Sequence, residues 1–324
     1  MRRVVAILGT LCLLQLGLTA CGDDDGEKKN TGSVTVTGEF GTAPTVTYDG
    51  QLNRVDTDYE VLIEGSGPTV EDGDSMFAHI YIGNGFTGEQ ALSTYDPPEP
   101  TPGQKKQTAA QKRPRPTLLT LSKDTLPVFR DALIGQAIGS RIEVLATPDD
   151  AYAGSGNADI GIANEDSVVF VVDLISEVLD APTGTTKKAP AGLPSLVEKD
   201  GKVTGFDFTK TGDPAKGLQV ITLVQGTGRA IEAGAPIAMR YLGQVWGAKK
   251  PFDENYKAET PGTFNIGVGE LVKGWDRGLV GVKGGSRVLL VIPPKLGYGV
   301  KGNKDAGIKG TDTLVFVIDV LGVG

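Results

Sequence analysis

The sequence predicts an α+β protein built mainly from antiparallel strands, and three observations support that fold class. Glycine is abundant, with 46 residues among 324, which suits strands joined by tight turns. Side chains alternate with period two over 218–223 and 237–241, as strands require. The clearest helical stripe, with apolar residues every four positions, is short and spans 269–279. One short helix against an antiparallel sheet gives an α+β domain.

The first 21 residues are typical of an export signal. A basic start and a mostly apolar core (residues 4–18) precede the junction Leu18-Thr19-Ala20-Cys21. The core is too short to predict a membrane span. The junction resembles the lipobox of bacterial lipoproteins, in which the cysteine is acylated and becomes the new N-terminus. An ordinary secretory signal with a chance cysteine is the alternative.

Cysteine usage agrees with lipidation of Cys21. Cys12 lies in the discarded core, so the mature chain keeps no thiol for a disulfide, a metal site or catalysis. Two acyl chains give stable anchoring, whereas a single chain binds membranes only marginally. We therefore expect an extracytoplasmic protein, lipid-anchored to the bacterial cell membrane.

Composition predicts two domains after this signal. Residues 22–50, rich in Gly, Thr, Asp and Lys, predict a flexible tether, with a short strand at 34–37 as the alternative. Prolines, glycines and lysines at 181–200 predict a linker. The remaining segments, 51–180 and 201–324, each have the length of one domain.

The two segments resemble each other, which predicts an internal repeat. The aligned features are Gly65-Ser66-Gly67 with Gly226-Thr227-Gly228, Tyr81 with Tyr241, Phe129 with Trp275, Tyr152 with Tyr298, and Phe170 with Phe316. The first copy carries an insertion near 97–117, whose prolines, glutamines and basic residues predict a disordered surface loop. A patch that binds anionic lipid or cell-wall polymer is the alternative for this loop.

Residues 201–324 resemble a domain of the FKBP family, the macrolide-binding peptidyl-prolyl isomerases. The resemblance is carried by Tyr241 and Gly243, Phe252-Asp253, Phe264 to Gly267, Leu271-Val272, Gly274-Trp275, Pro293-Pro294, Tyr298-Gly299, Ile308 and Thr313 to Phe316. Members of this family fold as a twisted antiparallel β-sheet wrapped around a short α-helix, and the substrate proline enters between them. The resemblance implies two FKBP-like domains, of which the first is a degenerate copy.

The resemblance also implies a pocket and its residues. The catalytic residues would be Tyr241, Phe252, Asp253, Trp275, Tyr298 and Phe316, and the substrate-binding residues would be Leu271, Val272, Ile308 and Phe264. Trp275 would form the floor. The Tyr298 hydroxyl and the Val272 amide would each donate to a substrate carbonyl, and Asp253 would line the polar edge. Neither a metal nor a cofactor is expected.

The aromatic and aliphatic residues of 271–275, 288–292, 297–299 and 314–320 include no nucleophile, metal-ligand set or histidine, so the chemistry there must come from the shape of a pocket. Rotation about an X–Pro bond breaks amide resonance, at a barrier of ~18–20 kcal/mol. A 10⁶-fold acceleration requires ~8 kcal/mol of differential stabilisation, whereas one hydrogen bond supplies about 1 kcal/mol net. Complementarity to the twisted amide must supply the larger part.

Two departures from the family pattern qualify these expectations. Gly262 stands where many members have an aromatic residue, which is expected to open one wall. The first copy reads Ala91-Leu92-Ser93 near the expected Phe-Asp pair, and Phe129 replaces the tryptophan. We expect this copy to be inactive, serving to bind extended chains or as a spacer. His79, the only histidine, is expected to be structural.

The predicted function is that of a peptidyl-prolyl cis-trans isomerase that assists folding of extracytoplasmic proteins. Its partners would be proline-containing unfolded or nascent polypeptides, macrolide inhibitors, and the membrane through the lipid anchor. A net charge of −8 argues against binding to nucleic acid. The alternative is a non-catalytic chaperone or peptide-binding lipoprotein.

Overall fold

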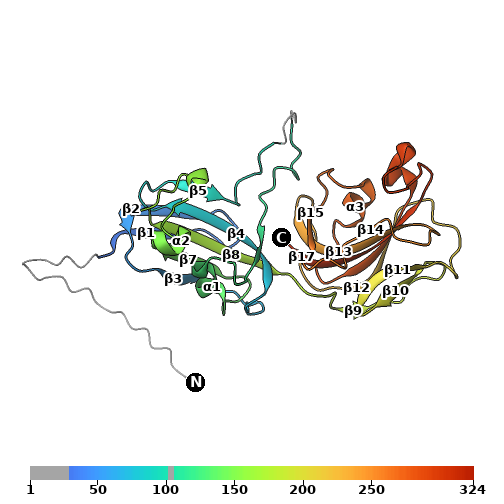
Figure 1. The fold of residues 1–324 in the computed structure, drawn as a ribbon, viewed down its shortest axis with the longest axis horizontal. Helices are drawn as coiled ribbons and strands as arrows, with labels where there is room; N and C mark the ends of the chain where they lie inside the picture. Colours follow the sequence, from blue (N-terminus) through green and yellow to red (C-terminus); the bar gives the residue numbers. More distant parts are fainter. Residues whose placement is uncertain (1–28, 101–105) are drawn as a thin grey trace, which may run out of the picture.

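The computed structural model describes residues 29–100 and 106–324, and these form two mainly β domains that lie side by side (Figure 1). The predicted signal peptide and Cys21 lie outside the described residues. Within the described ranges, no helix is long and apolar enough to cross a membrane.

The first domain is a six-stranded antiparallel sheet with short helices on one face. Its strand order is β3-β7-β8-β4-β5, with β6 also paired to β4. The strands are β3 (Asp58–Ile63), β4 (Ser75–Asn84), β5 (Gln90–Ser93), β6 (Thr117–Thr120), β7 (Arg141–Ala146) and β8 (Val168–Glu177), and the helices are α1 (Pro127–Leu133), α2 (Pro148–Tyr152) and η1 (Ala158–Ile160).

The second domain repeats this arrangement in a seven-stranded sheet. Its order is β14-β13-β17-β16-β12-β9, with β15 also paired to β13. The strands are β9 (Thr185–Thr186), β12 (Gln219–Gln225), β13 (Pro236–Val245), β14 (Asp253–Glu254), β15 (Gly262–Asn265), β16 (Arg287–Ile292) and β17 (Leu314–Val323), and the helices are α3 (Lys273–Gly278), η2 (Pro294–Leu296) and η3 (Gly299–Lys301). The predicted strand patterns at 218–223 and 237–241 lie within, or within one residue of, β12 and β13.

A β-hairpin covers the outer face of each sheet. The hairpins are β1 (Thr31–Thr37) with β2 (Thr45–Asn53), and β10 (Ser195–Lys199) with β11 (Lys202–Asp207). The prediction of a flexible tether over 22–50 is therefore wrong for residues 31–50. Val34, Val36, Val46 and Tyr48 share one face of the first hairpin and pack against the sheet. The predicted linker likewise contains β9 and β10.

Two hydrogen bonds confirm the alignment of the glycine turns. The amide of Gly65 donates to Oγ of Ser140 at 2.9 Å, and the amide of Gly226 donates to Oγ of Ser286 at the same distance. An ion pair between neighbouring strands also recurs, since Arg141 pairs with Asp173 in the first domain and Arg287 pairs with Asp319 in the second. These contacts support the internal repeat.

The alignment of Tyr81 with Tyr241 is wrong by one residue. Tyr241 lies opposite Ile318 and Gly243 opposite Phe316, whereas Ile80 and Ile82 occupy the corresponding places opposite Val172 and Phe170. A shift of one residue moves a side chain to the other face of a sheet. Tyr81 accordingly packs outward beneath the first hairpin, and Ile80 and Ile82 face the core.

Residues 106–117 of the insertion pack against the second domain, contrary to the prediction of a disordered loop. Nε2 of Gln111 donates to the carbonyl of Val268 at 3.0 Å. The guanidinium of Arg113 forms an ion pair with Glu232. The insertion therefore bridges the two domains.

The ends of β8 and β17 form a second bridge between the domains. Oγ of Ser176 donates to the carbonyl of Val323 at 2.7 Å, and the amide of Leu179 donates to the carbonyl of Leu321 at 3.0 Å. Phe77, Ile175 and Ala238 form a small buried cluster that draws on both domains.

The helix predicted over 269–279 is shorter in the structure. Val272 is its N-cap, in an extended conformation, and the helix ends at Gly278. Trp275 and Leu279 are buried as predicted, whereas Leu271 lies in the approach to the helix. This approach and the helix cover one face of the second sheet and form a pocket with it.

Candidate active site

The second domain has a pocket of about 470 Å³ between α3 and its sheet. All of the predicted site residues except Ile308 line it, namely Tyr241, Phe252, Asp253, Phe264, Leu271, Val272, Trp275, Tyr298 and Phe316. These residues come from β13, β14, β15, β17, α3 and the loops between them. The fold thus brings together residues that are up to 75 positions apart in the sequence.

Trp275 forms the floor of this pocket and is almost fully buried. Its ring centroid lies 5.1 Å from those of Tyr241 and Phe316 and 6.0 Å from that of Phe264, with interplanar angles of 77–82°. Such edge-to-face contacts are favourable for aromatic pairs. Trp275 belongs to the buried core of the domain as well as to the pocket.

The wall formed by Phe252 and Phe316 depends on a glycine. The two rings pack edge to face, with centroids 5.6 Å apart. Gly243 lies beneath them, and a Cβ there would lie 2.8 Å from Cζ of Phe252 and would overlap Phe316. The backbone of β13 can approach these rings only because position 243 has no side chain.

Tyr241 and Asp253 form the polar edge of the pocket. The Tyr241 hydroxyl donates to Oδ2 of Asp253 at 2.8 Å. Burial raises the pKa of Tyr241, and the bond to Asp253 raises it further, because loss of the proton would leave two negative charges side by side. The phenol therefore stays protonated at neutral pH, and Asp253 is held by a permanent donor.

Besides the buried Nε1 of Trp275, the pocket lining includes two hydrogen-bond donors that have no partner among the described residues. One is the backbone amide of Val272, which precedes the first turn of α3, and the other is the hydroxyl of Tyr298. A peptide bound across the aromatic floor could accept from both. Their places agree with the roles that the family resemblance implies for these two residues.

Ile308 and Gly262 differ from the expectations. Ile308 is buried in the core and does not line the pocket. Its backbone exchanges two hydrogen bonds with Asn303, which closes the loop behind Tyr298. The absence of a side chain at Gly262 does not leave open space, because a Cβ there would lie 2.6 Å from the ring of Phe264.

Sequence reasoning missed three lining residues, which are Glu270, Lys273 and Gly297. Glu270 and Lys273 flank Leu271-Val272 in the sequence, and this adjacency to predicted pocket residues is the feature that could have identified them. They place one negative and one positive side chain at the rim. Gly297 lies beside Leu314, since a Cβ on it would meet Cδ1 of that residue at 3.1 Å.

The corresponding region of the first domain has different side chains. Ile82 occupies the place of Gly243, and Ala91 and Leu92 stand where Phe252 and Asp253 stand in the second domain. Ile82 and Ala91 pack into the core of the first domain, where the ring centroids of Phe129 and Phe170 lie 4.9 Å apart. The side chain of Ile82 therefore occupies the volume that, in the second domain, Gly243 leaves free for the rings of Phe252 and Phe316.

A metal centre finds no support in the part of the chain that the structure describes. No group of three or more His, Cys, Asp or Glu side chains there is arranged to hold a metal ion. His79 stacks on Tyr95 with centroids 4.5 Å apart, and its Nδ1 lies 3.0 Å from Oγ1 of Thr94.

Comparison with known proteins finds similarity within the second domain. A family model described as FKBP-type peptidyl-prolyl cis-trans isomerase matches residues 227–321. An FK506-binding protein of Streptomyces anulatus is 34% identical over 112 residues, which cover 35% of this chain and 90% of that protein. FK506-binding protein 4 of Chaetomium thermophilum is 39% identical over 114 residues, covering 33% of this chain and 23% of that protein.

A solved structure of a peptidyl-prolyl cis-trans isomerase from Pseudomonas syringae pv. tomato is 29% identical and covers 35% of this chain and 80% of that chain, with a TM-score of 0.30. The matches to the family model and to the Streptomyces protein are independent of the geometry described above. Since this chain spans nine-tenths of that bacterial relative, it belongs to the family of FKBP-type peptidyl-prolyl cis-trans isomerases and is an enzyme of that type.

Proposed function

We propose that the pocket above Trp275 accelerates X–Pro isomerisation by binding the twisted amide more tightly than the planar one. The observation that carries this proposal is an aromatic enclosure with two unpaired donors at its edge, Val272 N–H and Tyr298 O–H. The enclosure accepts the proline ring, and the donors hold the flanking carbonyl groups.

The energetic argument depends on the polarity of the amide. A planar amide is strongly polarised by resonance, whereas the twisted amide keeps the nitrogen lone pair localised and carries less charge separation. The rings of Trp275, Phe316 and Tyr241 exclude water from the proline, so the enclosure disfavours the planar form more than the twisted one. No covalent step and no proton transfer to the protein are needed.

The donors orient the peptide so that rotation occurs within the enclosure. Each neutral hydrogen bond is worth about 1 kcal/mol net, which is small beside the ~8 kcal/mol that a 10⁶-fold acceleration requires. We assign Tyr298 and Val272 to positioning of the substrate and assign the larger share to the fit of the proline against Trp275. Asp253, held by Tyr241, lines the polar edge.

We propose that the first domain is an FKBP-like domain without isomerase activity. Its support is the shared strand order together with Ile82, Ala91 and Leu92 in place of Gly243, Phe252 and Asp253. Such a domain would bind extended chains or hold the second domain away from the membrane.

The location and the clients are also proposals. The junction at Cys21 supports a lipid anchor on the outer side of the bacterial cell membrane, and the substrates would then be proline-containing polypeptides that fold outside the cytoplasm. Macrolides that fit the same pocket would act as inhibitors. The shared chemistry of these ligands is an apolar ring flanked by carbonyl groups.

The test measures cis-to-trans rates of a proline peptide with the full chain, with residues 181–324, with residues 29–180, and with full-length Asp253→Ala; the two fragments keep β9 and the first hairpin intact. The full chain and the C-terminal fragment are expected to accelerate the reaction, and the N-terminal fragment is not. A full chain that suppresses aggregation of unfolded protein while no species changes the spontaneous rate would replace the enzyme with the chaperone alternative.

A further inference from the structure

A groove with basic side chains lies directly beside the isomerase pocket. It has a volume of about 630 Å³, and its walls come from two segments, residues 245–252 at the end of β13 and after it, and residues 306–312 before β17. Phe252 lines both the groove and the pocket, so the two hollows adjoin at its ring. A polypeptide held in the pocket can therefore continue past Phe252 into the groove.

The groove carries more positive than negative charge. Lys249, Lys250 and Lys309 line it, and Asp312 is the one acid in its lining. The carboxylate of Asp312 accepts from the backbone amide of Lys309 at 2.8 Å, which holds it in its own loop. The three lysine side chains are exposed, and none forms an ion pair with any residue in 29–100 or 106–324. The groove thus presents ammonium groups without an acid partner, in a chain whose net charge is −8.

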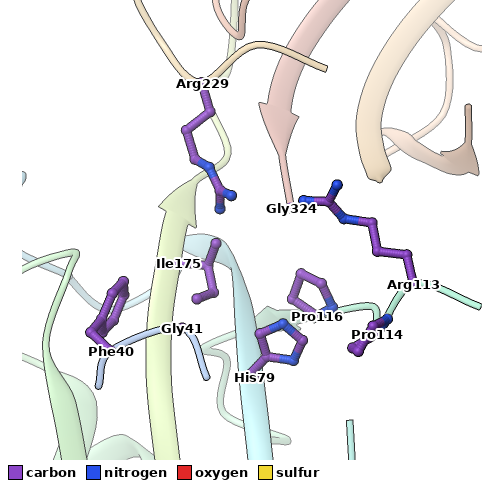
Figure 2. A pocket seen from close by; sticks show the side chains of 9 residues that line it. All are labelled: Phe40, Gly41, His79, Arg113, Pro114, Pro116, Ile175, Arg229 and Gly324. Atoms are coloured by element: carbon purple, nitrogen blue, oxygen red, sulfur yellow. The ribbon is translucent and has the colours of Figure 1, made fainter. Parts of the chain in front are cut away.

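The cavity between the two domains also has basic side chains, but it is separate from the isomerase pocket. Its volume is about 480 Å³, and Arg113 and Arg229 lie around it together with Gly324 (Figure 2). Arg113 is already paired with Glu232. This cavity shares no lining residue with the isomerase pocket, whereas the groove shares Phe252. A substrate that extends from the pocket therefore meets the lysines of the groove first.

Backbone hydrogen bonds hold both walls of the groove in place. The amide of Trp246 donates to the carbonyl of Thr313 at 2.9 Å, which ties the first segment to the end of the second. Asn303 and Ile308 exchange two bonds of 2.8 Å, which close the loop of the second segment. The groove is thus formed before a substrate arrives, and this reduces the cost of ordering it on binding.

The charge changes sign across Phe252. On the pocket side lies Asp253, which accepts a hydrogen bond from the hydroxyl of Tyr241. On the groove side lie Lys249 and Lys250. A carboxylate next to the bound proline is therefore repelled by Asp253, whereas one beyond Phe252 is attracted by the lysines. Two residues of extended chain span about 7 Å, which carries the polypeptide past one aromatic ring.

We propose that this groove binds an acidic segment of the substrate polypeptide that begins about two residues from the isomerised proline. Lys249, Lys250 and Lys309 then determine specificity by pairing with its carboxylates. This preference depends on the proposed function of the pocket, because the pocket must hold the proline for the flanking chain to reach the lysines. Exposed ion pairs are individually weak, so the preference for an acidic over a neutral segment is about 3- to 10-fold.

The experiment measures kcat/KM of the full-length protein with matched peptides that each contain a single proline. One pair carries a run of glutamates or glutamines before the proline, and the other pair carries the same runs after it. In one of the pairs, the glutamate peptide should exceed its glutamine counterpart by about 3- to 10-fold at low ionic strength. The difference should shrink in about 0.5 M salt, because ions screen exposed charges. The favoured pair also gives the direction in which the chain crosses Phe252.

Variants assign the preference to the groove. Lys249→Gln combined with Lys250→Gln should remove most of the difference between the glutamate and glutamine peptides, and Lys309→Gln, on the opposite wall, should remove a smaller part. The matched control is Lys187→Gln combined with Lys188→Gln, because these are also adjacent exposed lysines and line neither the groove nor the pocket. The control should keep the full preference, since it changes the total charge equally but not the charge of the groove.

The outcomes separate this proposal from the proposed function. Equal kcat/KM for glutamate and glutamine peptides in the wild-type protein would overturn the acidic preference, while the acceleration of both would leave the isomerase intact. A preference that survives in the variant of Lys249 and Lys250, or that is lost equally in the control, would also overturn it. Spontaneous rates with every peptide would refute the proposed function and the preference together.

Discussion

Gly243 lies directly opposite Phe316 where β13 pairs with β17, and a Cβ on Gly243 would overlap the Phe316 ring. In the first domain, Ile82 lies opposite Phe170 at the corresponding place. The two domains share a strand order, but at this contact the first domain has an isoleucine side chain and the second domain has none. A glycine at position 243 therefore lets the rings of Phe252 and Phe316 form the wall of the isomerase pocket.

This relationship predicts that Gly243→Ala lowers kcat/KM by at least about tenfold, which corresponds to ~1.4 kcal/mol of transition-state stabilisation. The added methyl group must displace Phe316 or Phe252. Steady-state kinetics with a proline peptide measures the effect. Gly205→Ala is the matched control, because a Cβ there meets only a Gln244 side-chain atom at 3.7 Å. Full activity of Gly243→Ala would show that the wall is not constrained as described.

Tyr298→Phe tests the share of catalysis that comes from the free hydroxyl. One neutral hydrogen bond is worth ~0.5–1.5 kcal/mol, so kcat/KM should fall by no more than about tenfold. The ring of Tyr298 remains, and the enclosure around the proline is kept. A loss of three orders of magnitude would instead assign the chemistry to the hydroxyl and would refute the dominance of shape.

Trp275→Ala should damage stability and activity together, since this side chain belongs to both core and pocket. Truncating a buried aromatic residue costs ~3–5 kcal/mol of unfolding free energy, which urea denaturation measures. Trp246→Ala is the control, because Trp246 is the other tryptophan and packs at the outer cluster. It should leave kcat/KM nearly unchanged. A Trp275→Ala protein of unchanged stability would contradict the shared role.

Glu143 predicts a pH dependence of stability. Burial raises its pKa to about 7, nearby Glu60 and Asp58 add to the shift, and Oε1 of Glu143 is buried without a hydrogen-bond partner among the described residues. The folded protein thus binds this proton more tightly than the unfolded chain does. Its contribution to stability is complete below the unfolded pKa of 4.5 and is lost as pH rises through about 7.

Glu143→Gln removes this dependence. The variant should be more stable than wild type at pH 8 by roughly 1–3 kcal/mol and nearly equal to it at pH 4. Urea midpoints at the two pH values measure the difference. Glu89→Gln, at an exposed position, should show no such change. An equal effect of Glu143→Gln at both pH values would argue against a titrating carboxyl group.

The sequence predicted most of the pocket because its residues are distinctive in type and order. Trp275, Phe316 and Tyr298 each lie where their place in the motif indicated. Ile308 was assigned to the pocket but lies in the core behind it. The sequence could not distinguish the two positions, because an apolar side chain is compatible with both. The charged rim residues Glu270 and Lys273 are not part of the motif, so the sequence did not indicate them.

The misaligned Tyr81 has a physical cause. Tyr81-x-Gly83 and Tyr241-x-Gly243 have the same spacing, and a hairpin makes the outer face of each sheet apolar as well as the inner one. Alternation identifies the register only where one face is polar. The first hairpin was predicted only in part, as the alternative strand at 34–37, which lies in β1. Thr and Gly surround Val34 and Val36, so the segment has the composition of a tether.

The most direct test of the isomerase pocket compares Trp275→Leu with Phe129→Leu, its counterpart in the first domain. Both full-length variants are first shown to be folded by circular dichroism, and kcat/KM for a proline peptide is then measured. Trp275→Leu should lose at least about tenfold in kcat/KM, and Phe129→Leu should remain within about twofold of wild type. Full activity of Trp275→Leu together with loss of activity in Phe129→Leu would place catalysis in the other domain and contradict the account.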